Sequence, residues 1–371
     1  MGRMIPNIEV LSRVLADGFV ELSLEESSIP KPAADEVVVE VHAAPINSFD
    51  LRLMIGPADP TTAVAVGTRD RPVTRLRIPD RSASIPQGAH RLGAEGFGRV
   101  VDAGIAPAAR ALLNRSVAAW AGGMYSRYCK VRTSECLPLP ASTPAAAGAG
   151  ALINPLTAQA MVETMRTEGY AALLNSAACS NLGSILRRLC LVEGIELMNV
   201  VRSSEQAQAL RSAGVRHVCV SSAASVVDDL TAWLRGAGPT LGFDAVGGGS
   251  LAGTLISAMD AAKAHDALDS GKDGRPSKVY IYGSLDPSPS LISRRYSSPW
   301  SIAGWVLPAI LKTISPDRVS ELKQRIVKDL TTVFAAQYTR TVSLAEMIAP
   351  QTIAACARRS TGAKHLVDPR L

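Results

Sequence analysis

The sequence predicts an α/β protein with two domains, a β-rich domain followed by a doubly wound parallel sheet. The chain has 371 residues, and because a domain takes about 150, two domains are expected. Short strand patterns separated by glycine and proline fill roughly the first 145 residues, whereas strands alternate with helices from Pro144 onward. Hydrophobic residues make up 47% of the chain and charged residues 19%, so it can bury a large core and is not disordered.

Strands of the first domain are expected at Glu36–Val41, Phe97–Val101 and Tyr128–Val131, where β-branched and aromatic residues cluster. Frequent glycine and proline residues between such runs favour a compact barrel or sandwich. The segment Pro57–Gln87 is rich in proline, threonine and arginine and has weak periodicity. We expect it to be a long surface loop, a kind of segment that is often functional.

The second domain is expected to open with one long helix at Ala145–Glu168, which Gly169 ends. After it, strands and helices alternate at a pitch typical of a parallel sheet with right-handed crossovers. The expected strands are Ala171–Ser176, Glu196–Val201, His217–Ser221, Leu241–Val246 and Lys278–Gly283, and the expected helices are Leu182–Val192, Glu205–Ala213, Ser225–Arg235 and Ser250–Ala262.

The last part of the chain is less regular. The charged segment His265–Pro276, which contains glycine and proline, predicts an exposed loop. Ser293–Val306 carries an aromatic cluster, which indicates either a packed helix or a substrate or dimer surface. Val319–Phe334 has helical spacing, and His365–Val367 predicts a final strand that returns to the first domain. The expected domains are residues 1–145, with 335–371 returning to them, and residues 146–334.

Charge and composition exclude several classes of protein. Lys plus Arg is 39 and Asp plus Glu is 33, and the resulting charge of +6 is spread without the basic run typical of nucleic-acid binding. No apolar stretch is long enough to span a membrane, and the first residues lack the apolar core of a signal peptide. The six cysteines form no Cys-x-x-Cys pair, which argues against a disulfide framework or a structural zinc lobe. We expect a cytoplasmic protein with no nucleic-acid or membrane partner.

The most informative segment is Leu174–Gly183, which joins the first strand of the alternating region to its first helix. In a doubly wound sheet this turn directs backbone N–H groups and a helix N-terminus toward a pyrophosphate. The usual pattern is Gly-x-Gly-x-x-Gly, but here Ala178 and Ser180 stand at the first two glycine positions and only Gly183 remains. The alternative is an ordinary strand–helix turn. Small side chains still allow close approach, so we predict phosphate binding by Ser180, Asn181, Leu182 and Gly183.

The end of the second strand predicts which dinucleotide is bound. An acidic residue there would bind the adenosine ribose hydroxyls and select NAD, but the chain has Arg202, Ser203 and Ser204. A positive charge with hydroxyl groups suits a 2′-phosphate, so NADP(H) is expected over NAD. In the alternative interpretation a serine only caps the next helix while Arg202 is solvated, and both interpretations can hold together.

Several short motifs occur in order along the chain. They are Ala43–Leu51 ("AxxNxxDL"), Gly93–Gly104 ("GxEGxGxVxxxG"), Gly122–Cys129, Leu137–Pro140, Asn154–Ala158 ("NxxTA") and Phe243–Gly248 ("FDxVGG"). Together they resemble the medium-chain dehydrogenase/reductase superfamily, in its zinc-independent branch of quinone oxidoreductases and enoyl reductases, and the resemblance spans nearly the whole chain. It implies a GroES-like β-rich catalytic domain plus a Rossmann domain, and it implies a homodimer.

Departures from the family pattern narrow the chemistry. Zinc-dependent members carry a cysteine near the position of Ser48 or Phe49 and a histidine where this chain has Ala94. A catalytic zinc site needs three protein ligands, so no metal site is expected. Some enoyl reductases have a catalytic tyrosine in the region matching Gly56–Pro60, and this chain has none there.

The resemblance implies an NADPH-dependent, zinc-independent oxidoreductase that transfers hydride to a quinone or an α,β-unsaturated carbonyl compound. It places Asn47 and Thr157 beside the nicotinamide or its ribose as catalytic residues. Two further functions stay open, an enoyl-thioester reductase of polyketide or fatty-acyl biosynthesis and a catalytically silent NADPH-binding protein. Asn47 could also be only a turn residue and Thr157 only a helix hydroxyl. Further cofactor contacts are expected from Tyr282, Gly283, Ser284 and Lys364, the last of which could also be a solvated charge.

Overall fold

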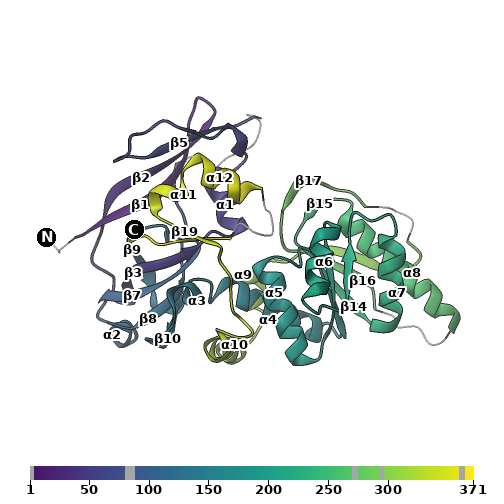
Figure 1. Ribbon diagram of the computed structural model, residues 1–371. Helices are drawn as coiled ribbons and strands as arrows, with labels where there is room; N and C mark the ends of the chain where they lie inside the picture. Colours follow the sequence, from purple (N-terminus) through teal and green to yellow (C-terminus); the bar gives the residue numbers. More distant parts are fainter. Residues whose placement is uncertain (1–3, 80–87, 270–274, 293–295, 359–363) are drawn as a thin grey trace. The chain divides into compact units, whose positions relative to one another are not determined.

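The computed structural model describes residues 4–79, 88–269, 275–292, 296–358 and 364–371 (Figure 1). The chain divides into two compact units. Unit 1 combines Met1–Ile153 with Ile326–Leu371, and unit 2 is Asn154–Arg325. Among the helices of the described ranges, none has the length and apolar character needed to cross a membrane.

Unit 1 is built from two sheets. The first has the strand order β4-β5-β2-β1-β6, and its long β1 and β2 pair as an antiparallel hairpin from Ile5↔Ile29 to Val14↔Val20. Its buried residues include the apolar Val10, Val20, Leu22 and Leu76, and also a few polar side chains such as Ser12 of β1. The strands are β1 (Ile5–Val14), β2 (Phe19–Ile29), β4 (Val64–Ala65), β5 (Val73–Arg77) and β6 (Ala89–Arg91).

The second sheet of unit 1 has the order β10-β8-β7-β3-β20-β19, with β9 also paired to β3. The C-terminal strand β20 runs antiparallel to β3, so the end of the chain completes this sheet (Figure 1). Its strands are β3 (Glu36–Pro45), β7 (Glu95–Ala103), β8 (Ser116–Trp120), β9 (Tyr128–Arg132), β10 (Cys136–Leu139), β19 (Arg340–Val342) and β20 (His365–Val367). The helices of unit 1 are α1 (Ser48–Ile55), η1 (Pro60–Thr62), α2 (Pro107–Leu112), η2 (Thr133–Glu135), α3 (Ala145–Ala149), α11 (Leu344–Met347) and α12 (Pro350–Ala357).

One apolar core joins the elements of unit 1. Alternate residues of β3 (Val37, Val39 and Val41) are fully buried in it together with Met54 of α1. Gly98 of β7 lies so close to β3 that a Cβ there would overlap the carbonyl of Glu40. The glycine of this motif is therefore explained by close strand packing.

Unit 2 is a parallel six-stranded sheet with the order β13-β12-β11-β14-β16-β18. Numbered along the chain, this is the 3-2-1-4-5-6 order of dinucleotide-binding folds, whose ligand crevice lies where the order reverses. A separate two-stranded sheet pairs β15 with β17. The strands are β11 (Ala172–Asn175), β12 (Glu196–Val201), β13 (Val218–Val220), β14 (Thr240–Asp244), β15 (Gly247–Gly249), β16 (Ser277–Ile281), β17 (Asp286–Ser290) and β18 (Trp300–Gly304).

Helices α5 to α8 connect the first five strands of this sheet, as expected of parallel crossovers, whereas no helix lies between β16 and β18 in the described residues. One apolar core packs α7 and α8 against the sheet and includes Leu230, Leu255 and Leu174. The helices are α4 (Ile153–Thr167), α5 (Asn181–Glu193), α6 (Ser204–Ser212), α7 (Val226–Ala237), α8 (Leu251–Asp269), α9 (Leu307–Leu311) and α10 (Pro316–Asp329).

Two predictions about secondary structure were wrong. The helix expected at Ala145–Glu168 is interrupted, because Gly150 ends α3 and α4 starts only at Ile153. A Cβ at Gly148 would overlap the Phe97 ring, so the first piece is fixed by packing on β7. The helix considered for Ser293–Val306 is instead β18, since Trp300–Gly304 pairs with β16; residues 293–295 lie outside the described ranges.

Two expected loops are also shorter than predicted. Within Pro57–Gln87, Val73–Arg77 is a strand that pairs with β2 and buries Thr74 and Leu76; residues 80–87 are outside the described ranges. Within His265–Pro276, α8 continues to Asp269, and residues 270–274 are not described. The period-two pattern of β5 was masked by the polar composition of the segment around it.

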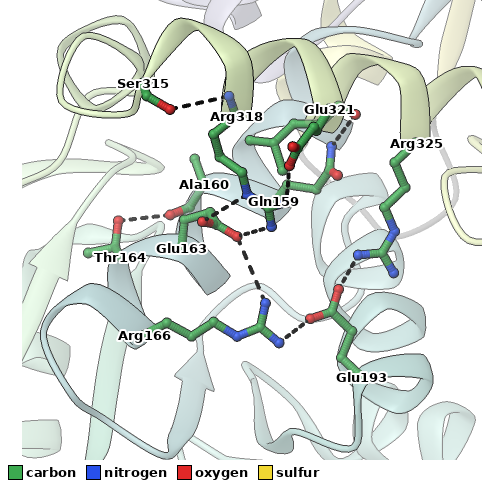
Figure 2. Close-up of polar contacts among 11 residues, drawn as sticks. Gln159, Ala160, Glu163, Thr164, Arg166, Glu193, Ser315, Arg318, Glu321 and Arg325 are labelled. Atoms are coloured by element: carbon green, nitrogen blue, oxygen red, sulfur yellow. Dashed lines mark hydrogen bonds and ion pairs between the residues drawn. The ribbon is translucent and has the colours of Figure 1, made fainter.

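Within unit 2, α10 is attached to α4 and α5 by a network of ion pairs (Figure 2). The Arg318 guanidinium donates to both carboxylate oxygens of Glu163 on α4, at 2.7 and 3.3 Å. At the end of α5, Glu193 pairs with Arg166 at 2.5 Å and also with Arg325 of α10. The side chain of Glu193 is only 11% exposed, since its two arginine partners cover it.

We expect Glu193→Ala to lower the free energy of unfolding by about 1–3 kcal/mol, because it removes a poorly exposed carboxylate that two guanidinium groups share, and Arg166 would keep only its longer contact with Glu163 at 3.8 Å. Chemical denaturation followed by circular dichroism measures this change. Glu321→Ala is the matched control: that carboxylate is 60% exposed and pairs with Arg318 within one helix, so its loss should cost at most ~0.5 kcal/mol. Equal effects of the two variants would contradict the assignment.

Candidate functional site

The turn between β11 and α5 lies at the carboxyl edge of the unit 2 sheet, where the strand order reverses. Ala177 has a positive φ of 53°, which is unusual for a residue with a side chain. Ser180 is the N-cap of α5, and its Oγ accepts the Gly183 N–H at 2.9 Å. The hydroxyl proton of Ser180 is not used in that bond, so it can still be donated to an acceptor such as a phosphate oxygen.

Gly183 is required by close packing of the helix on the turn. A Cβ at this position would lie 2.5 Å from the Ala178 carbonyl oxygen and 2.7 Å from its Cα. This is the role of the third glycine in dinucleotide-binding turns. Asn181 is the first residue of α5 and Leu182 is buried, so Leu182 can offer a ligand only its backbone.

At the end of β12, both interpretations of the serines have structural support. Ser203 is the N-cap of α6 and accepts the Gln206 N–H at 3.4 Å. Ser204 is the first residue of that helix. The backbone N–H of Arg202 donates to the Gln206 side chain at 3.0 Å, and Arg202 itself is exposed. The cap leaves the guanidinium of Arg202 at the same edge as the phosphate turn.

Other polar groups gather at the ends of β11, β14 and β16. Ser176 donates to Asp244 at 2.8 Å, and the backbone N–H of Ala245 donates to Ser176 at 2.7 Å. The Tyr282 hydroxyl donates to Asn175 Oδ1 at 3.1 Å, and the Tyr282 backbone N–H is used by the Asp244 carbonyl. The expectation that Tyr282 offers its backbone to a cofactor therefore applies only to its carbonyl.

Three residues at this edge complete the comparison with the sequence. A Cβ at Gly283 would overlap the Ala245 carbonyl, so Gly283 permits a close crossing of two loops. Ser284, the next residue, is exposed. The amide nitrogen of Asn175 is buried and has no hydrogen-bond partner among the described residues. Sequence reasoning missed Asn175, although a polar residue at the end of a buried strand was a usable signal.

In unit 1, Asn47 lies at the start of α1 beside two buried carboxyl groups. Its Nδ2 donates to Glu95 Oε1 at 3.0 Å, and its backbone N–H donates to Asp50 Oδ2 at 3.0 Å. Glu95 also accepts the Ile153 N–H at 2.9 Å, and Asp50 accepts the Ala94 N–H at 2.8 Å. Tyr125 donates to the Pro45 carbonyl at 2.8 Å, directly before this turn.

Burial controls the protonation of this cluster. Loss of solvation raises the pKa of Glu95 to about 7, although N–H donors from Ile153 and Asn47 oppose the shift. The same cause raises the pKa of Asp50 to about 6. Glu95 is therefore a carboxyl group whose charge changes near neutral pH. Neither carboxyl was predicted as a site residue, since the family motifs that contain them gave no indication of their burial.

The remaining predicted site residues lie in different places. Thr157 is buried on α4 in unit 2, whereas Asn47 is in unit 1. Lys364 lies just before β20; its carbonyl accepts the Thr339 N–H at 2.8 Å, and its own N–H donates to the Thr339 hydroxyl at 3.1 Å. The three residues before it are outside the described ranges. Across the described part of the chain, no group of three His, Cys, Asp or Glu residues is arranged to hold a metal ion.

Comparison with models of known protein families gave no match, and neither did comparison with curated protein sequences. Solved structures do match, and they show that the chain has the predicted α/β fold, which it shares with structures named as quinone reductases and enoyl reductases. A protein from Mesorhizobium loti, provisionally named an NADPH:quinone reductase, matches with a TM-score of 0.74 and 23% identity over 100% of both chains. A quinone oxidoreductase from Pseudomonas syringae matches with a TM-score of 0.69 and 18% identity over 98% of this chain and 100% of its own. The CurK enoyl reductase matches with a TM-score of 0.69 and 14% identity over 98% and 99%.

We expect Gly183→Ala to disrupt the phosphate turn, because its Cβ would collide with backbone atoms that cannot move away without unwinding the start of α5. The expected loss of stability is about 2 kcal/mol or more, measured by thermal unfolding. Gly236→Ala is the control: this helical glycine has open space around its Cβ position, so the variant should be neutral or gain up to ~1 kcal/mol. A Gly183→Ala protein as stable as the parent would refute the packing role.

Proposed function

We propose that the chain is an NADPH-dependent oxidoreductase that transfers hydride, without zinc, to a quinone or an α,β-unsaturated carbonyl compound. The observation that carries this proposal is the phosphate turn of unit 2. It joins the first strand to the first helix at the reversal of a 3-2-1-4-5-6 sheet, which is where dinucleotides bind in this architecture.

The residues at this edge fit a dinucleotide with a 2′-phosphate. Gly183 allows the helix to approach the turn, and the Ser180 hydroxyl keeps a proton to donate. The N-terminus of α5 favours negative charge. Arg202, with Ser203 and Ser204, would hold the 2′-phosphate through charge-assisted hydrogen bonds. The remainder of the cofactor would contact Tyr282, Gly283, Ser284 and Lys364.

Bound NADPH would supply the hydride, and the chain would bind and orient the reactants. Asn47 and Thr157 are proposed to lie at the nicotinamide, where a carboxamide and a hydroxyl can hydrogen-bond to the ring substituent or ribose. A carbonyl acceptor gains negative charge as hydride reaches its β-carbon, so hydrogen-bond donors fixed beforehand stabilise the transition state. Ser48, Phe49 and Ala94 stand where zinc-dependent relatives carry ligands.

The matching structures support this reaction class through their names, which include NADPH:quinone reductase, quinone oxidoreductase and enoyl reductase. The enoyl reductase match keeps an enoyl thioester as the second candidate acceptor. A homodimer and a cytoplasmic location remain predictions from the sequence.

A panel of quinones, enones and enoyl thioesters, with NADPH absorbance as the readout, tests the proposed function. We expect oxidation of NADPH with quinones or enones, because the chain lacks the tyrosine that some thioester reductases use. Turnover of thioesters alone would favour the second candidate. Binding of NADPH with no turnover on the whole panel would identify a silent cofactor-binding protein.

We expect Arg202→Ala to weaken NADPH binding roughly 10- to 100-fold, because a hydrogen bond to a charged group contributes about 1.5–3 kcal/mol. Binding of NADH, which has no 2′-phosphate, should change less than about 2-fold. Titration of intrinsic fluorescence or calorimetry measures both constants. The control is Arg216→Ala, an exposed arginine just before β13 and so at the opposite edge of the sheet. An equal loss for both cofactors would remove the assigned role.

A further inference from the structure

Glu95 connects two parts of the chain that the sequence links to catalysis. Its side chain is almost fully buried, with 1% of the residue exposed. Oxygen Oε1 accepts the amide of Asn47 at 3.0 Å, and oxygen Oε2 accepts the N–H of Ile153, the first residue of α4, at 2.9 Å. The carboxyl therefore fixes the turn before α1 and the start of the helix that carries Thr157.

Asn47 is the accessible member of this arrangement. It is half-buried, and the next two residues along the chain are exposed. A carboxamide has two N–H donors on one nitrogen, and Glu95 accepts one of them. The capping interaction with Asp50 holds the backbone of Asn47 as well. The Asn47 side chain is also hydrogen-bonded to the Asp50 carboxyl, so two buried carboxyl groups orient this half-buried carboxamide.

We propose that Glu95 is a positioning residue of the reductase site, which holds the Asn47 carboxamide in the orientation in which it contacts the bound cofactor or acceptor. This inference rests on the proposed function. It differs from a purely structural role of Glu95 as the cap of α4, which the contact with Ile153 would satisfy without Asn47.

The two roles predict different responses to pH. Only the ionised carboxylate accepts the Asn47 N–H and the helix N–H groups together, because protonation turns one oxygen into a donor. Positioning should therefore improve as pH rises through the pKa of Glu95, about 7. Three titratable groups face Glu95: Asp50 from α1, Tyr125 and Tyr338. Burial raises the pKa of both tyrosines, and the nearby carboxyl groups raise it further. Asp50 ionises below Glu95, and both tyrosines stay neutral over this range.

Folding stability should move in the opposite direction. The pKa of Glu95 is higher in the folded chain than its ordinary value near 4.5, so the folded state binds more protons between pH 4.5 and 7. The part of the stability that Glu95 contributes is therefore present at low pH and is lost as pH rises to about 7. A rate that increases while stability falls cannot be explained by a structural role alone.

The experiment compares the intact wild-type chain with Glu95→Gln, Asn47→Ala and the double variant, using NADPH and the best acceptor of the panel. Glutamine keeps the size of the side chain but cannot ionise. We expect Glu95→Gln to lower kcat about 10- to 100-fold with a KM for NADPH changed less than about 3-fold. The rise of kcat near pH 7 should disappear. In the Asn47→Ala background the same change should have no further effect on kcat, because the two residues act as one unit.

Thermal unfolding between pH 5 and 8 supplies a readout that does not need activity. The melting temperature of Glu95→Gln should fall less with rising pH than that of the wild type. Glu26→Gln, at an exposed position of β2, is the control and should match the wild type in every measurement.

Each outcome has a separate meaning. A wild type that oxidises NADPH and a Glu95→Gln variant with unchanged kcat and pH profile would overturn the positioning role and leave the proposed function standing. Additive effects of the two substitutions would also overturn it, since Glu95 would then act without Asn47. If the wild type oxidises NADPH with none of the acceptors on the panel, the proposed function is overturned, and the role of Glu95 with it.

Discussion

A parallel sheet places the carboxyl ends of all its strands at one edge, and this constraint organises unit 2. It collects at one edge Asn175 from β11, Arg202 from β12 and Asp244 from β14. Backbone donors cannot all be satisfied by the ladders where the strands end. Asp244 therefore accepts the N–H groups of Val246 and Gly247 at 2.8 and 3.1 Å, which fixes the loop after β14. The loops at this edge of the sheet are thus held in place by buried polar groups such as Asp244.

In unit 1, Asp50 and Glu95 are buried, and the cost of removing their carboxyl groups from water is offset only in part by hydrogen bonds. Transfer of a carboxyl from water is costly unless donors surround it, and here the donors are uncharged: amide N–H groups and, for Asp50, also the Tyr125 hydroxyl. Amide donors carry no positive charge, so they offset only part of the desolvation, and both pKa values stay raised. A guanidinium partner would instead have held these groups ionised at all physiological pH values. The choice of neutral donors is what makes Glu95 sensitive to pH near 7.

Much of the fold could be predicted from the sequence because its signals are local. Short segments are enough to predict the alternation of strands and helices and to recognise glycines such as Gly183. The predictions that failed needed tertiary information. Nothing local distinguishes Trp300–Gly304 as a strand, since only its pairing with β16 stabilises it. The contacts of Glu95 join residues 48 and 58 positions away along the chain, which no period or motif records.

The turn between β11 and α5 keeps only one of the three glycines usual in dinucleotide-binding turns, and the structure shows what the other residues do instead. Glycines in such a turn serve the turn conformation, backbone approach to the pyrophosphate and helix packing. Gly183 retains the packing role, where a Cβ would meet backbone. Ala177, just before the first replaced position, has a positive φ at a cost of order 1 kcal/mol. Ser180, at the second replaced position, gains an N-cap bond worth about as much. The two contributions nearly cancel, and the serine adds a hydroxyl where a phosphate would bind.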